Sequence, residues 1–110
     1  MAQWRASENT MKLITAENIK TFKKFPIGSQ EKVEDPKVIV KFFCPWNQWT
    51  WYATEAELQE DGDWLFFGYV VGLEKELGYF VLSELQSVKG PFGLKIERDM
   101  HFEGNLSNVK

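Results

Sequence analysis

Glu97, Asp99 and His101 alternate along one short segment near the end of the chain. If that segment is extended, all three side chains lie on the same side of it. Two carboxylates and an imidazole can bind a divalent metal ion or share a proton. His101 is the only histidine, so a site with several histidines is excluded and other ligands would have to come from elsewhere. A structural role explains the same residues, with Arg98 paired to a nearby acid and His101 at the surface.

Cys44 is the only cysteine, and with His101 it could form a nucleophile and base pair. It ends an apolar segment just before Pro45, whereas a reactive thiol needs an activating environment such as a helix N-terminus. We therefore expect a buried, unreactive thiol. The chain also lacks the G-x-S-x-G, P-loop, G-x-G-x-x-G and C-x-x-C patterns. These observations favour a protein without catalytic residues, metal ligands or cofactor.

Aromatic side chains are the more informative group. Four of them fall within seven residues: Trp46, Trp49, Trp51 and Tyr52. On a strand, Trp49 and Trp51 share one face and Tyr52 points to the other. An exposed set would anchor a protein interface or stack on single-stranded bases, with Lys37 and Lys41 contacting phosphates. A set covered by helices would be ordinary core.

Acidic side chains are concentrated just after this aromatic group. Five carboxylates lie within nine residues: Glu55, Glu57, Glu60, Asp61 and Asp63. The net charge is −3, and the acidic excess lies after residue 41. This balance disfavours a broad phosphate-binding surface and favours electrostatic steering toward a basic partner. The alternative is an acidic solvated loop.

The elements that must position these residues are short. Thr15 can cap a helix that ends before Pro26, and residues 37–43, 49–54, 63–71, 79–82 and 94–97 have the composition of strands. Gly68 indicates a bulge or a close backbone approach. Ser83 to Gln86 fits a capping box that opens a short late helix. Short connections favour antiparallel pairing, so we expect an α+β fold: a mostly antiparallel sheet of four to five strands, an N-terminal helix and a short late helix.

A chain of 110 residues predicts one domain. We expect a flexible N-terminal extension over residues 1–10, a single α+β domain over 11–104, and a polar tail over 105–110. The longest apolar run, Trp64 to Val71, is far shorter than the ~20 residues of a membrane span. Together with the single cysteine and the lack of a leader-like start, this predicts a cytoplasmic protein with no membrane partner.

The ordered succession of motifs resembles a small bacterial family of unknown function found on plasmids, phages and other mobile elements. The residues that carry the resemblance are Lys41-Phe42-Phe43, Pro45, Trp49-Thr50-Trp51-Tyr52, Thr54-Glu55, Phe66-Phe67-Gly68-Tyr69-Val70, Gly72-Leu73-Glu74, Glu76-Leu77-Gly78-Tyr79-Phe80, Leu82, Glu84-Leu85, Gly90-Pro91, Gly93-Leu94 and Ile96-Glu97-Arg98-Asp99. The resemblance covers about residues 11–102. It implies no reaction and no catalytic residues, only a genomic setting in which small proteins often interfere with host defence or assist DNA transfer.

The leading hypothesis is therefore a non-enzymatic protein-interaction module of a mobile element, acting as a counter-defence inhibitor of anti-restriction or anti-CRISPR type. Its partner would be a protein, such as a host defence nuclease. We expect Trp46, Trp49 and Tyr52 to anchor that partner, and the five acids to steer it: Glu55, Glu57, Glu60, Asp61 and Asp63. The alternatives are a single-stranded nucleic-acid accessory protein and, third, a metal-dependent enzyme.

Overall fold

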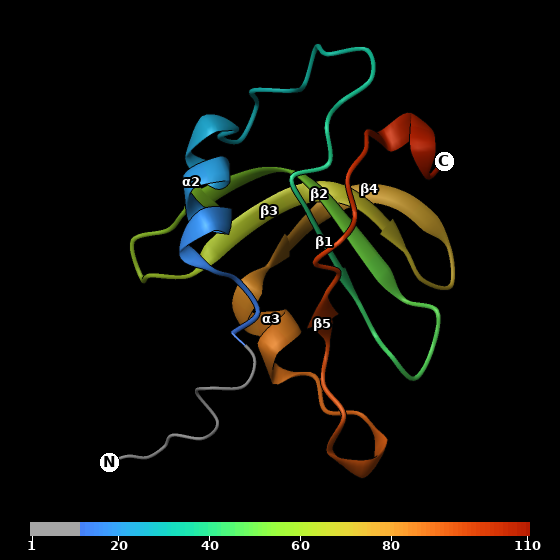
Figure 1. The fold of residues 1–110 in the computed structure, drawn as a ribbon. Coiled ribbons are helices and arrows are strands. Elements are labelled where there is room, and N and C mark those ends of the chain that lie inside the picture. Colours follow the sequence, from blue (N-terminus) through green and yellow to red (C-terminus); the bar gives the residue numbers. More distant parts are fainter. Residues whose placement is uncertain (1–11) are drawn as a thin grey trace.

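The computed structural model describes residues 12–110, which form one five-stranded sheet with a helix before it and a short helix late in the chain (Figure 1). The elements, in chain order, are α2 (Ala16–Lys24), β1 (Val40–Phe43), β2 (Thr50–Leu58), β3 (Trp64–Val71), β4 (Lys75–Val81), α3 (Leu82–Ser87), η1 (Pro91–Gly93), β5 (Glu97–Arg98) and η2 (Leu106–Asn108). The strand order is β4-β3-β2-β1-β5, and all neighbours are antiparallel. The predicted α+β class is confirmed.

Helix α2 begins where the sequence predicts. The Thr15 hydroxyl accepts a hydrogen bond from the Asn18 amide at 3.2 Å, and the Asn18 side chain accepts one from the Thr15 amide at 2.9 Å. This reciprocal pair satisfies two amides of the first turn. One turn further on, Phe22 is completely buried and packs edge-to-face on Trp64 and Phe66 of β3, with ring centroids 5.1 Å and 5.3 Å away. The cap therefore fixes the start of a helix whose apolar face covers the sheet.

Strand β2 is longer than the composition predicts. It runs from Thr50 to Leu58 and so includes Glu55 and Glu57, which the sequence places in an acidic loop. Two acids of the group thus belong to the central strand of the sheet. The connection to β3 is correspondingly shorter, and Gly62 supplies its left-handed residue with φ 89°.

A β-bulge lies in the middle of β2. Ala53 and Glu55 pair with consecutive residues of β3, so Thr54 between them has no partner. Without the extra residue, strict alternation would turn Glu55 to the same face as Ala53. The bulge turns Glu55 to the opposite face and places Ala56 in the core beside Ala53.

Gly68 meets this bulge from the neighbouring strand. A Cβ atom at Gly68 would lie 2.7 Å from the Ala53 Cα, which no side chain tolerates, and closer still to the Tyr52 carbonyl oxygen. The predicted close backbone approach is confirmed. Its partner across the β3–β4 pair, Gly78, has no atom within 4 Å of the same position.

The sheet has a core on each face. On the face that we call the inner face, Phe22 of α2 and Leu85 of α3 pack against strand residues that include Phe42 and Phe66. On the outer face, the last residues of the chain pack against the strands: Leu106 is buried with Val38 and Tyr69, and Val109 lies against them. Figure 1 shows α2 and this C-terminal segment at opposite sides of the view.

The C-terminal segment differs from the sequence expectation of a polar tail over 105–110. Leu106 is only 4% exposed, and Asp35 holds Ser107 by accepting from both its amide and its hydroxyl, at 2.9 Å and 2.7 Å. The segment is therefore part of the domain. The expected N-terminal extension, residues 1–10, lies outside the described residues.

The late helix also begins differently. Its N-cap is Val81 rather than Ser83, and the Glu84 side chain accepts from the Val81 amide at 3.4 Å. The Ser83 hydroxyl donates instead to the Asp63 carboxylate. Within residues 12–110, no helix combines the length and the apolar character that crossing a bilayer requires.

Two glycine substitutions test the close approach at the bulge. We expect Gly68→Ala to lower the free energy of unfolding by about 1–3 kcal/mol or more, because the new methyl group meets backbone atoms that cannot yield. Gly78→Ala is the matched control, and it should be neutral or slightly stabilising because the space is open and glycine weakens a strand interior. Urea unfolding measures both, and equal effects would contradict the assignment.

Candidate functional site: a partner-binding surface

Trp51 of β2 and Trp49, which directly precedes the strand, lie on the inner face near one end of the sheet. Trp51 is half-buried against the inner core, and its ring centroid is 5.8 Å from that of Trp49. Trp49 is 37% exposed and lies directly over Gly72 of the β3–β4 turn, where a side chain would collide with the indole. Tyr52 points to the outer face, where it packs on Tyr69. The opposite orientation of Tyr52 agrees with the strand alternation expected from the sequence.

Trp46 joins two loops at this end of the sheet. It lies in the β1–β2 connection, and its ring packs so closely on Gly90 that a Cβ there would be 2.7 Å from indole atoms. Gly90 lies in the loop that follows α3. The half-buried indole thus packs against the backbone of this loop.

The loop after α3 presents an apolar side chain that the sequence analysis did not select. Phe92 is fully exposed and has a left-handed backbone, with φ 56° and ψ 29°. Two backbone hydrogen bonds close the loop, from the Gly90 amide to Leu94 and from the Leu94 amide to Pro91, at 2.8 Å and 3.0 Å. The signal available in the sequence is an aromatic residue enclosed by turn residues, Gly90-Pro91-Phe92-Gly93.

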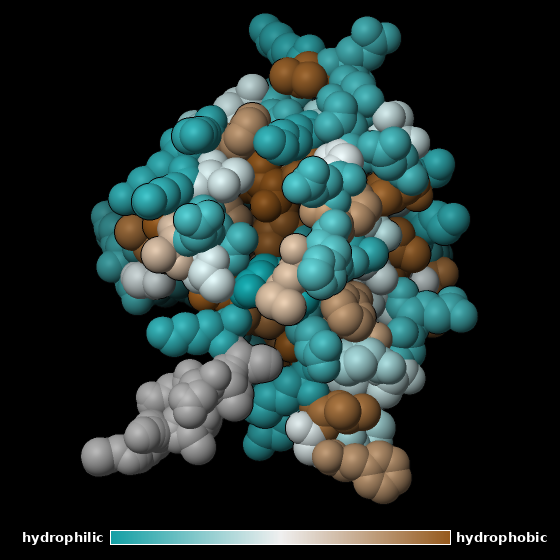
Figure 2. Space-filling view, in the orientation of Figure 1, coloured by the Kyte–Doolittle hydropathy of each residue, from teal (hydrophilic) through white to brown (hydrophobic). Residues whose placement is uncertain are grey.

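Exposed apolar side chains therefore gather at the end of the sheet where these three turns lie. We call this the turn-end surface; it consists of the exposed Trp49, Leu73, Phe92 and Leu94 together with the half-buried Trp46. Leu73 is 93% exposed, and Leu94 is 37% exposed. In Figure 2, hydrophobic side chains protrude at the lower end of the view, where Figure 1 draws the loop after α3.

The five acids do not form one group. Glu57, Glu60 and Asp61 are exposed at the β2–β3 end of the sheet. Glu57 lies eight residues beyond Trp49 along the chain, which is roughly 25 Å at the rise of a strand. Trp49 thus lies at the opposite end of the sheet from Glu57, Glu60 and Asp61, so the predicted anchors and acids do not form one continuous surface.

Glu55 is not part of any exposed acidic surface, contrary to the sequence expectation. It is only 3% exposed, and its two carboxylate oxygens accept hydrogen bonds from the amides of Gly28 at 2.7 Å and Gln30 at 2.9 Å. The Gln30 side chain continues the network by donating to the carbonyl oxygens of Lys37 and Thr54, at 2.8 Å and 2.7 Å. The carboxylate therefore has a structural role.

Asp63 also has internal partners. It accepts from the Ser83 hydroxyl at 2.6 Å, from the Ser83 amide at 3.0 Å and from the Trp64 amide at 2.9 Å. The Ser83 hydroxyl is the largest of the effects that hold the pKa of this carboxyl below its ordinary value, and burial opposes them in part. Asp63 thus connects the β2–β3 turn to the first turn of α3.

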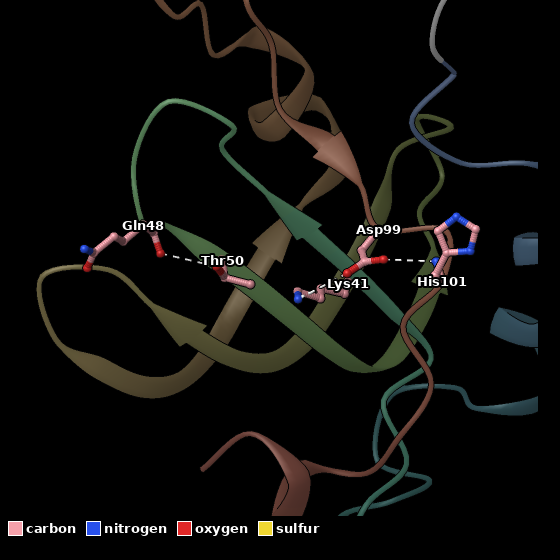
Figure 3. Close-up of polar contacts among 5 residues, drawn as sticks. All are labelled: Lys41, Gln48, Thr50, Asp99 and His101. Atoms are coloured by element: carbon pink, nitrogen blue, oxygen red, sulfur yellow. Dashed lines mark hydrogen bonds and ion pairs between the residues drawn. The ribbon is translucent and has the colours of Figure 1, made fainter.

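The residues considered for metal or acid–base chemistry have other contacts (Figure 3). Asp99 forms an ion pair with Lys41 at 3.2 Å and accepts a hydrogen bond from the His101 backbone amide at 3.0 Å. The contact involves the amide of His101 and not its imidazole ring, and His101 is exposed. Arg98 donates to the carbonyl oxygens of Lys12 and Leu13, at 3.2 Å and 2.8 Å, rather than to an acid. Among residues 12–110, no three potential ligands from histidine, cysteine, aspartate and glutamate converge on one point.

The cations and the thiol fit structural roles as well. Besides its ion pair, the Lys41 ammonium lies over the rings of Tyr52 and Phe102, at 5.4 Å and 5.2 Å from their centroids. A cavity of about 250 Å³ opens beside Lys41 and Asp99, but these charges already neutralise each other. Cys44 is buried, and burial raises the pKa of its thiol, which makes a nucleophilic thiolate less accessible.

Removal of the Glu55 carboxylate tests its structural role. We expect Glu55→Ala to lower the free energy of unfolding by about 2–4 kcal/mol, because two amides lose their charged acceptor in a buried site. Glu57→Ala, two residues along the same strand and exposed, is the control and should change stability by less than about 0.5 kcal/mol. Chemical denaturation distinguishes them. Similar small losses in both variants would show that Glu55 is not a structural anchor.

The lowered pKa of Asp63 predicts an acid-dependent stability. A carboxyl whose folded pKa is depressed stabilises the fold above its unfolded pKa of about 3.9, and this contribution is lost as the pH falls through the folded pKa. We therefore expect Asp63→Asn to be less stable than the wild type at neutral pH, with a difference that narrows below about pH 4. Thermal unfolding across this pH range measures it, with the exposed Glu60→Gln as the control. A difference independent of pH would contradict the prediction.

The comparisons with known proteins identify one family for this chain. Residues 9–108 match the family described as a protein of unknown function (DUF2958). Neither a curated protein nor a solved structure matches the chain. The match includes all strands and helices of the described fold. The chain therefore belongs to the DUF2958 family.

Proposed function

We propose that this protein is a non-enzymatic interaction module that binds a partner protein through its turn-end surface. Phe92 supports this proposal most directly, because a large apolar side chain is fully exposed on a loop that packing and hydrogen bonds hold in place. Exposed aromatic anchors of this kind contribute a large share of the binding energy at protein interfaces. Trp49 and Leu73 are further exposed apolar side chains at this end of the sheet.

The backbone of Phe92 strengthens the argument. A left-handed conformation costs a residue with a side chain about 1–2 kcal/mol, and glycine would avoid that cost. A fully exposed ring has no packing inside the described domain that would offset it. Strained residues often occur at binding sites, where contact with a partner provides the compensation.

The charges at the two ends of the sheet suggest which charges the partner surface carries. Lys89 and Lys95 are exposed on either side of the Phe92 loop, so an apolar pocket with an acidic rim would complement it. At the far end, Glu57, Glu60 and Asp61 favour approach to a basic surface. Such long-range attraction raises the rate of association and weakens with salt, whereas the buried aromatic anchor slows dissociation.

The biological role that we propose is that of a counter-defence inhibitor carried by a mobile genetic element, of the anti-restriction or anti-CRISPR type. A host defence nuclease would present the basic surface, because it must bind DNA phosphates. The genomic setting rests on the family resemblance of the motifs. The single-stranded nucleic-acid alternative has less support for two reasons. The Lys41 charge is neutralised by Asp99. In addition, Trp51 and Tyr52 point to opposite faces of the sheet, so they do not form one stacking surface.

A glycine substitution at Phe92 separates binding from stability. We expect Phe92→Gly to keep or increase stability, by up to about 1 kcal/mol, because the left-handed backbone suits glycine. Binding to the partner should weaken at least about tenfold, the loss of one aromatic anchor. Leu58→Ser, which changes a side chain that is 56% exposed at the opposite end of the sheet, is the control.

The measurement has two stages. Proteins from a host lysate that the wild type and Leu58→Ser retain, but Phe92→Gly does not, are identified and their affinities measured by calorimetry. The same variants are then expressed in cells with an active restriction or CRISPR system, where only Phe92→Gly should lose protection of an incoming phage or plasmid. Equal binding by Phe92→Gly and the wild type would exclude the turn-end surface as the binding site. Loss of tryptophan fluorescence on adding oligonucleotides at low salt would instead favour the nucleic-acid alternative.

A further inference from the structure

Strand β4 forms one edge of the sheet, and no strand of residues 12–110 pairs with the backbone edge that faces away from β3. A free strand edge carries a row of unpaired amides and carbonyls that another strand can complete. The opposite edge, β5, has only two residues, so β4 with seven residues is the long free edge of this fold.

The edge of β4 lacks the features that usually prevent pairing. Charged residues occur only at its start, Lys75 and Glu76, and the five residues after them contain neither a charge nor a proline. Its pairing with β3 is continuous from Lys75 to Val81, so no bulge twists it away. Leu77 and Tyr79 are 49% and 63% exposed on the outer face. An exposed apolar edge of this kind favours association with a further strand.

We propose that β4 pairs antiparallel with β4 of a second copy, across a two-fold axis at Gly78. Gly78 is the midpoint of the strand, so only this register pairs all seven residues of both copies. It places Leu77 opposite Tyr79 of the second copy, which covers both exposed side chains. A two-fold interface requires this kind of self-complementarity.

The charges of β4 agree with this register. Its charged start lies opposite its apolar end: Lys75 meets Val81 of the second copy, and Glu76 meets Phe80. No like charges are opposed, whereas an axis at Glu76 would set two carboxylates against each other. This matching of a charged half with an apolar half is the reason to assign a second copy as the occupant.

The surroundings of the axis leave room for the second copy. No atom lies within 4 Å of the position of a Cβ at Gly78. Helix α3 follows β4 directly, but its buried residues Leu82 and Leu85 pack into the inner core. On the outer face, the Phe67–Tyr79 pair, with ring centroids 4.9 Å apart, would continue into Leu77 of the second copy. The two sheets would then share one apolar row.

A cysteine at the axis tests both the association and its register. Antiparallel partners have Cα atoms about 4.5–5.5 Å apart, which is within reach of a disulfide. Gly78→Cys should therefore form a covalent dimer on oxidation by oxidised glutathione, and the native Cys44 is buried and does not compete. Leu73→Cys, on the exposed β3–β4 turn, is the matched control and should cross-link only slowly. Equal cross-linking of the two variants would overturn the proposed register.

Sedimentation velocity tests the unmodified chain. We expect a dimer that forms within the micromolar to millimolar range, and Leu77→Lys should raise its dissociation constant at least about tenfold by placing charges in the interface. A wild type that stays monomeric throughout this range would overturn the proposal. Phe92→Gly should leave the dimer unchanged, so this result is independent of the function proposed for the turn-end surface.

Discussion

The buried carboxylate of Glu55 lies on the middle strand of the sheet and accepts two amide hydrogen bonds from the connection between α2 and β1. Charge-assisted bonds of this kind are strong, and here water cannot replace them. Gln30 extends the interaction to the backbone of Lys37 and Thr54. The connection is thereby fixed to β2, and with it the positions of α2 over the inner face and of β1 along the edge of β2. The bulge at Thr54 is what turns the carboxylate toward these amides.

The long central strand separates the two kinds of surface. Because Trp49 directly precedes β2 and Glu57 lies near the end of that strand, the apolar turn-end surface and the exposed acids lie at different places. At the turn end, Trp46 supports Gly90, and this contact together with the closing backbone bonds holds the Phe92 loop. A side chain presented on a pre-ordered loop loses less conformational entropy on binding than one on a mobile loop.

The two edges of the sheet differ because the chain leaves β4 and β5 toward opposite faces. After β5, the chain returns along the outer face, and Leu106 packs with Val38 and Tyr69. After β4, helix α3 turns to the inner face, and Asp63 fixes its first turn through Ser83. The free edge of β4 consequently keeps its unpaired backbone groups, and its side chains Leu77 and Tyr79 stay exposed on the outer face. The same connections that complete the inner core thus leave one long strand edge uncovered.

Features set by neighbouring residues were predictable from the sequence alone: the Thr15 cap, the antiparallel strands, the opposite orientation of Trp51 and Tyr52, and the close approach at Gly68. They depend on local geometry and on the two-residue period of a strand. Tertiary structure decided the rest, because the decisive contacts join distant segments. Glu55 meets an amide 25 residues away, and Ser83 meets Asp63 at a separation of 20. A lone carboxylate in the sequence is expected to be exposed, and only the fold shows that amide donors reach Glu55. The turn residues around Phe92 indicate a loop, but the contact of Trp46 with Gly90, which helps to hold that loop, joins segments that are distant in the sequence.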